Sequence, residues 1–95
     1  MAKKINASHI LVKTEQDARV ISYDVNHGKS FEEIAKEKSL CPSKKNGGNL
    51  GWFARGQMVK EFEQACFDPK LKKGDIIGPI KTQFGYHIIK IIDIQ

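Results

Sequence analysis

The spacing of hydrophobic and polar residues changes along the chain between a pattern typical of strands and one typical of helices. Residues 5–12 are rich in β-branched and aliphatic side chains and predict a strand. Residues 86–92 are apolar on both alternating faces, which favours a central strand covered on both sides. Residues 50–53 and 76–80 predict two further strands, and Pro79 indicates that the latter lies at an edge of the sheet.

Two helices are predicted after the first strand, and each begins at a capping signal. Thr14 and Asp17 have the spacing of a capping box, and the apolar residues that follow share one helical face until Gly28. Ser30 and Glu33 form a second box before a short helical pattern. The first connection is therefore expected to hold two successive helices.

A further helix is predicted in the second half of the chain. Residues 39–49 predict a loop with one helical turn after Pro42, and residues 59–67 predict a helix that ends at Asp68-Pro69. The order becomes strand, two or three helices, strand, helix, strand, strand. A short glycine-containing turn joins the last two strands, so they are expected to form an antiparallel hairpin. We therefore expect a single α+β domain over residues 1–95, with helices around a small sheet.

Composition narrows the class of protein without identifying a function. The chain is 40% hydrophobic and 28% charged, as in ordinary soluble domains. No apolar run approaches the roughly 20 residues of a membrane span, and the N-terminal MAKKINAS has no hydrophobic signal core. Cys41 and Cys66 lie too far apart for a CxxC motif and fit a reducing compartment. We therefore expect a cytoplasmic monomer, since nothing in the sequence signals an oligomer.

The charge balance favours diffuse attraction to anions. The chain has sixteen basic and eleven acidic residues, a net charge of +5, and fourteen of the basic residues are lysine. Lysine recognises bases and phosphates less specifically than arginine. The aromatic residues that could stack on bases are expected in the core or a pocket; they are Phe31, Trp52, Phe62 and Phe67. No specific nucleic-acid binding is therefore predicted. A solvated lysine surface is the simplest interpretation. The alternative is weak peripheral association with an anionic membrane surface, at the inner face of the membrane. The lysines available for it are Lys3, Lys4, Lys36, Lys38, Lys70, Lys72 and Lys73.

Two histidines interrupt hydrophobic runs. His9 leads into the aliphatic end of the first predicted strand, and His87 lies within GYHIIKII of the last. A buried polar group without a partner costs roughly 1–3 kcal/mol, so each ring is expected to hydrogen-bond, bind a ligand or take part in chemistry. His27 lies beside a glycine in a polar stretch and is expected at the surface.

Three kinds of functional site can be considered from local motifs: a zinc site, a cysteine nucleophile and a phosphate loop. His9, Cys41 and His87 lack the short spacing of a zinc site, and no fourth ligand is evident, so no metal is predicted. Cys41 with a histidine has the residue types of a nucleophile and base, but no third orienting residue or oxyanion hole is apparent. The run NGGNLG lacks the GK[ST] ending of a phosphate loop and is better explained as a tight turn before a strand.

Three stretches, taken together, resemble the parvulin family of peptidyl-prolyl cis/trans isomerases. They are SHILVK (residues 8–13), NGGNLGWFARGQMVKEFE (46–63) and GPIKTQFGYHIIKI (78–91), and they follow in the family's order over essentially the whole chain. The resemblance implies a four-stranded antiparallel sheet surrounded by about four helices, in the order β-α-α-α-β-α-β-β. It also implies a small, stand-alone domain of the prokaryotic type.

The same resemblance implies two groups of site residues. The candidate catalytic residues are His9, Cys41, Thr82 and His87. The candidate substrate-binding residues are Leu50, Gln57, Met58, Phe62 and Phe84. In the family the two histidines share a hydrogen-bond network with the hydroxyl residue, the cysteine faces the isomerising bond, and the apolar residues hold the proline ring. Whether the histidines serve catalysis or only stability stays open.

The activity implied is non-covalent rotation of X-Pro peptide bonds in proline-containing polypeptides, which assists folding or conformational switching and needs no cofactor. Phosphate-directed members carry an arginine-rich insertion after the first strand, whereas this chain has the short KTEQDAR there. A required phosphoserine is therefore not expected. The alternative is a non-catalytic module that holds proline-containing segments or adheres to anionic membranes.

Overall fold

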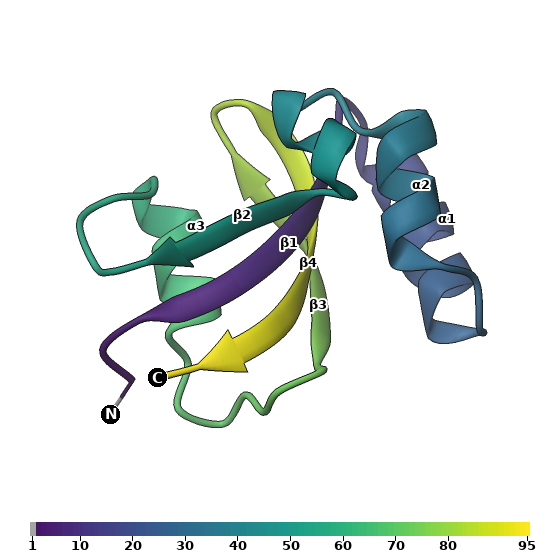
Figure 1. Ribbon diagram of the computed structural model, residues 1–95. Helices are drawn as coiled ribbons and strands as arrows, with labels where there is room; N and C mark the ends of the chain where they lie inside the picture. Colours follow the sequence, from purple (N-terminus) through teal and green to yellow (C-terminus); the bar gives the residue numbers. More distant parts are fainter. Residues whose placement is uncertain (1) are drawn as a thin grey trace.

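The computed structural model describes residues 2–95 and contains one four-stranded sheet with its helices. The elements are β1 (Ile5–Val12), α1 (Glu15–Asn26), α2 (Phe31–Lys38), the 3-10 helix η1 (Pro42–Asn46), β2 (Asn49–Phe53), α3 (Lys60–Cys66), β3 (Ile76–Thr82) and β4 (Gly85–Ile94). The strands pair antiparallel in the order β2-β1-β4-β3 (Figure 1). The α+β class and the four-stranded antiparallel sheet are thereby confirmed.

The expected helix count of about four is slightly high. The described residues form three α-helices, and the third helix of the expected order is only the short η1. Pro42 begins η1, and Gly47 ends it in the left-handed region at φ +67°. Gly48 follows at φ +89°, and its carbonyl accepts the N–H of His9 at 2.9 Å, so the glycines make a tight turn into β2.

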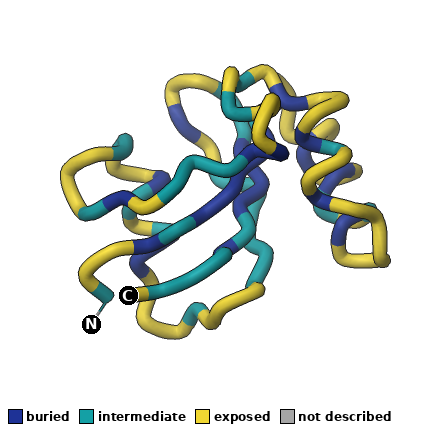
Figure 2. Tube along the Cα trace, in the orientation of Figure 1, coloured by how far each residue is buried: buried dark blue, intermediate teal, exposed yellow. Residues whose placement is uncertain are grey.

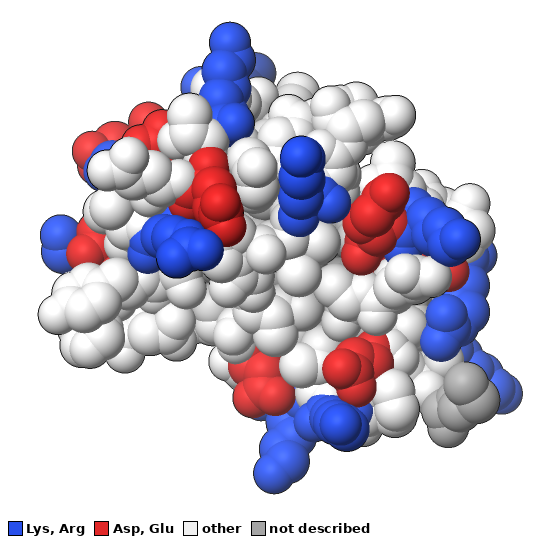
Figure 3. Space-filling model, turned by 180° about the vertical axis from the view of Figure 1, so that it is seen from behind, with Lys and Arg blue, Asp and Glu red and all other residues white. Residues whose placement is uncertain are grey.

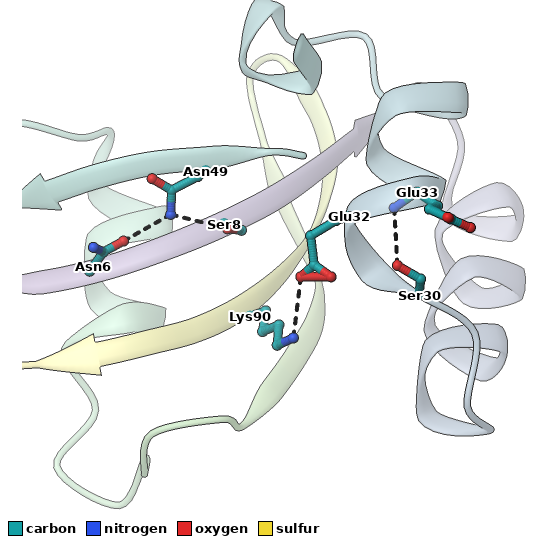
Figure 4. Close-up of polar contacts among 7 residues, drawn as sticks. All are labelled: Asn6, Ser8, Ser30, Glu32, Glu33, Asn49 and Lys90. Atoms are coloured by element: carbon teal, nitrogen blue, oxygen red, sulfur yellow. Dashed lines mark hydrogen bonds and ion pairs between the residues drawn. The ribbon is translucent and has the colours of Figure 1, made fainter. Parts of the chain in front are cut away.

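The two predicted capping residues are in place. The Thr14 hydroxyl accepts the N–H of Asp17 at 3.1 Å, and the Ser30 hydroxyl accepts that of Glu33 at 3.3 Å (Figure 4). Each cap satisfies one of the free N–H groups of a first helical turn. The helices consequently begin one residue after their caps, at the ends of β1 and of the Gly28 turn.

Both faces of the central strands are buried, by different helices (Figures 1 and 2). On one face, α3 packs on the cluster formed by Ile5, Ala7, Phe53, Phe62, Cys66, Phe67, Ile89 and Ile91. On the other face, α1 and α2 pack on the cluster formed by Ile10, Val12, Ala18, Ile21, Val25, Phe31, Ala35 and Ile88. This two-sided burial explains why β4 is apolar on both faces, and it leaves β3, with Pro79, at an edge as predicted.

Trp52 is a departure from the sequence prediction. It was expected in the core or a pocket, but its side chain is 44% exposed. The next residue, Phe53, points into the cluster under α3, so Trp52 projects from the opposite face of β2, where α1 and α2 do not reach (Figure 1). Polar contacts secure this end of the sheet: Asn49 donates to Asn6 at 2.9 Å and to Ser8 at 3.3 Å (Figure 4).

Within residues 2–95, the segment before β1 lies beside the end of β4 (Figure 1). The N–H groups of Lys3 and Lys4 donate to the carbonyl of Gln95, at 2.7 and 3.2 Å, and the N–H of Gln95 donates to Lys4 at 2.9 Å. Among the described residues, no helix has the length and apolar character needed to cross a membrane.

Candidate active site

A hollow of about 430 Å³ opens on the face of the sheet that also carries α3. Its floor comes from β1, β2 and β4, one wall from the loop before η1, and the other from the loop before α3. Eight of the nine predicted site residues line it: His9, Cys41, Leu50, Gln57, Met58, Phe62, Phe84 and His87. The ninth, Thr82, is buried and hydrogen-bonded to His87. The structure therefore brings together residues from both ends and the middle of the chain.

The floor of the hollow is a pair of stacked histidines. Pairing of β1 with β4 sets Leu11 opposite His87 and His9 opposite Ile89, so the two rings are diagonal neighbours on one face. Their Nδ1 atoms are 2.9 Å apart, and their ring planes differ by 17°. Phe62 meets both rings edge-on, with centroids 5.5 Å from His9 and 5.3 Å from His87. The pair is thus wedged between the sheet and α3.

The hydroxyl of Thr82 continues the contact toward the β3–β4 hairpin. Thr82 Oγ1 is 2.7 Å from His87 Nε2, and it accepts the N–H of Phe84 at 3.2 Å. Both nitrogens of His87 are therefore engaged, one with Thr82 and one with His9. The side chains of Thr82, His87 and His9 thus form a continuous series of polar contacts from the β3–β4 turn to the floor of the hollow.

Burial keeps both histidines neutral at pH 7. It lowers the pKa of His9 to about 4, with a further contribution from the neighbouring charge on protonated His87, and it also lowers the pKa of His87. Two neutral rings can share the Nδ1 contact, because one donates and the other accepts. His9 Nε2 is buried and has no hydrogen-bond partner within residues 2–95.

Cys41 lies at the edge of the hollow, held by its backbone. The buried Ser39 hydroxyl accepts the N–H groups of Leu11 and Cys41, at 3.1 and 3.3 Å, and Leu40 donates to the Leu11 carbonyl at 2.8 Å. These bonds fix Cys41 relative to β1. Because His9 Nε2 has no partner in the described chain, the geometry does not pair this thiol with a histidine base.

The second cysteine has a different environment. Cys66 is the last residue of α3 and is buried, and burial raises the pKa of its thiol to about 12, so it is unreactive at neutral pH. The described residues contain no group of three His, Cys, Asp or Glu side chains arranged to hold a metal ion.

The walls of the hollow are apolar. Leu50 projects from β2 and Phe62 from α3, with Met58 between these elements. Gln57 is the polar exception, but its side-chain oxygen accepts the N–H of Ala54 at 2.7 Å and is used locally. Among residues 2–95, no lysine, arginine, aspartate or glutamate lines the hollow.

The sequence prediction missed four residues of the lining: Leu11, Leu40, Pro42 and Val59. Leu11 lies two positions after His9 and therefore on the same face of β1, which is a signal that the strand period offers. The others are direct neighbours of predicted residues in the loops around Cys41 and Met58. Leu40 and Phe84 are 54% and 58% exposed, so the rim offers apolar surface to solvent.

Comparison with known proteins identifies the family of the chain. The model of the family described as "Rotamase: PPIC-type PPIASE domain" matches residues 6–93. The foldase protein PrsA 1 of Bacillus cereus is 54% identical over 93 residues, which are 97% of this chain and 32% of that protein. The foldase protein PrsA of Bacillus subtilis is 50% identical over 88 residues, covering 92% of this chain and 30% of that protein. The chain thus spans about a third of the length of these relatives.

Solved structures show the same fold. The peptidylprolyl isomerase PrsA of Bacillus anthracis superposes with a TM-score of 0.94 at 45% identity, covering 99% of this chain and 43% of that one. NmPin, the parvulin of Nitrosopumilus maritimus, gives 0.84 at 46% identity and matches over 98% of this chain and 99% of its own. With its sequence and its fold in agreement, the chain belongs to the PPIC-type peptidyl-prolyl isomerase family, the parvulins.

Proposed function

We propose that this domain is a peptidyl-prolyl cis/trans isomerase that rotates X-Pro bonds in polypeptides without forming a covalent bond, and thereby assists folding or conformational switching. The observation that carries the proposal is the uncharged hollow above the neutral His9–His87 pair. Membership of the parvulin family supports it. The chain spans about a third of the length of its PrsA relatives. What a longer protein of this kind does, and which substrates it acts on, is therefore part of the proposal.

The physical task is to lower a rotational barrier. Rotation about a peptide bond costs about 18–20 kcal/mol, because twisting destroys the conjugation of the amide. Uncatalysed X-Pro isomerisation takes tens to hundreds of seconds, so reaching about a millisecond requires roughly 10⁵-fold, or about 7 kcal/mol. The twisted bond is less dipolar than the planar one. A water-poor hollow therefore disfavours the planar ground state relative to the transition state.

The residues divide this work. Leu50, Met58 and Phe62 surround a space suited to a proline ring and exclude water from the bond. The histidine pair holds the floor in shape, since the two Nδ1 atoms contact each other and His87 Nε2 contacts the Thr82 hydroxyl. Cys41, fixed through its backbone, adjusts the electrostatics beside the rotating carbonyl and makes no bond to the substrate.

The proposal does not require a phosphorylated substrate. A phosphate needs positively charged partners, and the described part of the chain contributes no charged side chain to the lining of the hollow. Lys13, Lys44 and Lys45 are exposed outside the lining and supply at most a mild preference for acidic residues before proline.

The experiment is exchange spectroscopy by NMR on a panel of X-Pro peptides with varied X. The proposal predicts that the wild type accelerates cis/trans exchange, that Met58→Ala reduces this acceleration, and that Val20→Ala leaves it unchanged. Val20 is the control because it is exposed on α1, away from the hollow. No acceleration for any X would overturn it. If the peptides still shifted the amide signals of hollow residues, the alternative of a non-catalytic holder would replace it.

We further propose that the domain acts as a cytoplasmic monomer and that its lysine excess adds only weak, salt-sensitive attraction to an anionic membrane surface. In the view of Figure 3, acidic groups lie among the basic ones, which supports diffuse attraction. Sedimentation with vesicles that contain anionic lipid tests this: binding should fall as salt rises, and binding that ignores lipid charge would contradict it. Sedimentation equilibrium tests the monomer, and cell fractionation tests the location.

A further inference from the structure

The wall that carries Met58 is a loop without regular structure. Residues 54–59 connect β2 to α3, and Gly56 takes a positive φ of 91° that turns the chain back toward the helix. Gln57 is exposed and Met58 half-buried, so packing alone holds this segment weakly. Something else must fix the wall if the hollow is to keep its shape.

Glu63 of α3 is bonded to both ends of this short turn. Its Oε1 accepts the N–H of Gly56 at 2.5 Å, and its Oε2 is 3.6 Å from Nη1 of Arg55. Its own backbone N–H donates to the carbonyl of Val59 at 2.9 Å, as the first helical bond of α3. The Glu63 side chain is only 19% exposed, so solvent competes little with these contacts.

Only Gln57 and Met58 lie between the two attachment points, Gly56 and Val59. A two-residue bridge whose ends are both tied to Glu63 has little freedom, and the bond from the Ala54 N–H to the Gln57 side chain restricts it further. The carboxylate itself is anchored, because its partner Arg55 lies 4.6 Å above the buried Phe67 ring.

We propose that Glu63 is the positioning residue for the Gln57-Met58 wall and so sets where Met58 lies relative to Phe62 in the lining of the hollow. This role rests on the proposed function. Glu63 itself does not line the hollow, so it acts through the residues it holds. Because the wall contacts the proline ring in the ground state and in the transition state alike, loosening it weakens binding more than it slows the bound substrate.

The test compares Glu63→Ala with Glu63→Gln and with Glu61→Ala. The glutamine keeps an oxygen for the Gly56 N–H, whereas alanine removes it. Glu61 is exposed on the same helical turn, so its variant makes the same charge change without touching the loop. For Glu63→Ala we expect kcat/KM to fall about tenfold, mainly through KM, since small misplacements of binding groups have effects of this order. Glu63→Gln should recover to within about threefold of wild type, and Glu61→Ala should stay within about twofold.

Amide hydrogen exchange supplies the second readout. In Glu63→Ala, exchange should accelerate at Gly56, whose N–H loses its acceptor, and stay unchanged at Ile88 and Ile89 of the core. An unchanged kcat/KM per folded molecule, a Glu63→Gln variant no better than Glu63→Ala, or faster exchange throughout the sheet would each overturn the proposal. If the wild type isomerised no peptide, the proposed function would fail separately, and the exchange data alone would decide whether Glu63 holds the loop.

Discussion

His9 and His87 meet through their Nδ1 atoms at 2.9 Å, although 78 positions separate them in the chain. A single proton, carried by one of the two Nδ1 atoms, makes this contact a hydrogen bond. A second would place two N–H donors and two positive charges against each other in a water-poor site, which is costly. The two neutral rings therefore connect β1 to β4, and their protonation is expected to lower the stability of the whole domain.

Acidification should destabilise the protein through His9. Its pKa is about 4 in the folded state against an ordinary value of 6.5, so between these values the unfolded chain binds a proton that the folded chain does not. The stabilisation by this group is complete above about pH 6.5, is lost as the pH falls toward 4, and amounts to about 3 kcal/mol. Urea unfolding of wild type and His9→Asn from pH 7.5 to 4 measures it.

The His9→Asn variant should lose less stability over this interval than the wild type, whereas His27→Asn, which changes an exposed histidine, should follow the wild type. Equal losses in wild type and His9→Asn would show that other groups control the acid response.

The hydroxyl of Thr82 should matter more than its methyl group. In Thr82→Val, the buried His87 Nε2 loses its 2.7 Å partner, and we expect a loss of about 1–3 kcal/mol in the free energy of unfolding. Thr82→Ser restores the oxygen and should recover most of it. Chemical denaturation of the two variants measures the difference, and a serine variant as unstable as the valine one would assign the effect to packing.

Replacing Cys41 by serine should leave substantial isomerase activity. The proposed mechanism needs no bond between Sγ and the substrate, and the loop position comes from backbone bonds to Ser39 and Leu11, which the substitution preserves. Activity on an X-Pro peptide within about tenfold of wild type is the expected result. Complete loss in a variant with an unchanged NMR spectrum would instead indicate covalent chemistry.

Shortening Met58 should reduce catalysis more than stability. Met58 is half-buried and lines the hollow, so Met58→Ala enlarges the space around the proline ring without opening a sealed core cavity. We expect kcat/KM to fall about tenfold and the free energy of unfolding to change by about 1 kcal/mol. Exchange spectroscopy and urea unfolding on the same sample give both values. A stability loss as large as that of a core truncation would place Met58 in the core instead.

Phosphorylation of the substrate should bring little advantage. None of the described residues that line the hollow carries a charged side chain, so a phosphoserine before proline gains only distant attraction from lysines. The rates on matched peptides with phosphoserine and with glutamate should agree within about tenfold at physiological salt. An advantage of roughly 100-fold for the phosphopeptide would contradict this, because it requires a direct cationic partner for the phosphate.

Much of the fold follows from local rules. The caps at Thr14 and Ser30 require only a hydroxyl and the correct spacing, and Pro79 at an edge requires only the missing N–H. The short η1 was less predictable, because a proline at its start and a glycine after five residues fit either a loop or a helix. Trp52 was placed wrongly because its exposure depends on where α1 and α2 end, which is a property of tertiary packing.

The candidate site also combines features that the sequence predicts with features that only the tertiary structure shows. The nine predicted residues converge, yet their convergence could be expected only from the resemblance to a family, since His9 and His87 share no local spacing. The Glu63 contacts were not predictable at all: a glutamate in the first turn of a helix is ordinary, and only the folded loop brings Gly56 to its oxygen.

The hydrogen bonds that join Lys3 and Lys4 to Gln95 place the two ends of the domain at one point on its surface. A domain with this geometry can be inserted into an exposed loop of another protein. The insertion separates the two ends of the host loop by only a small distance, so closing that loop costs little additional entropy. The same adjacency makes the domain suited to circular permutation. Linking its ends and opening the chain in the Lys73-Gly74 turn would leave every strand of the sheet intact.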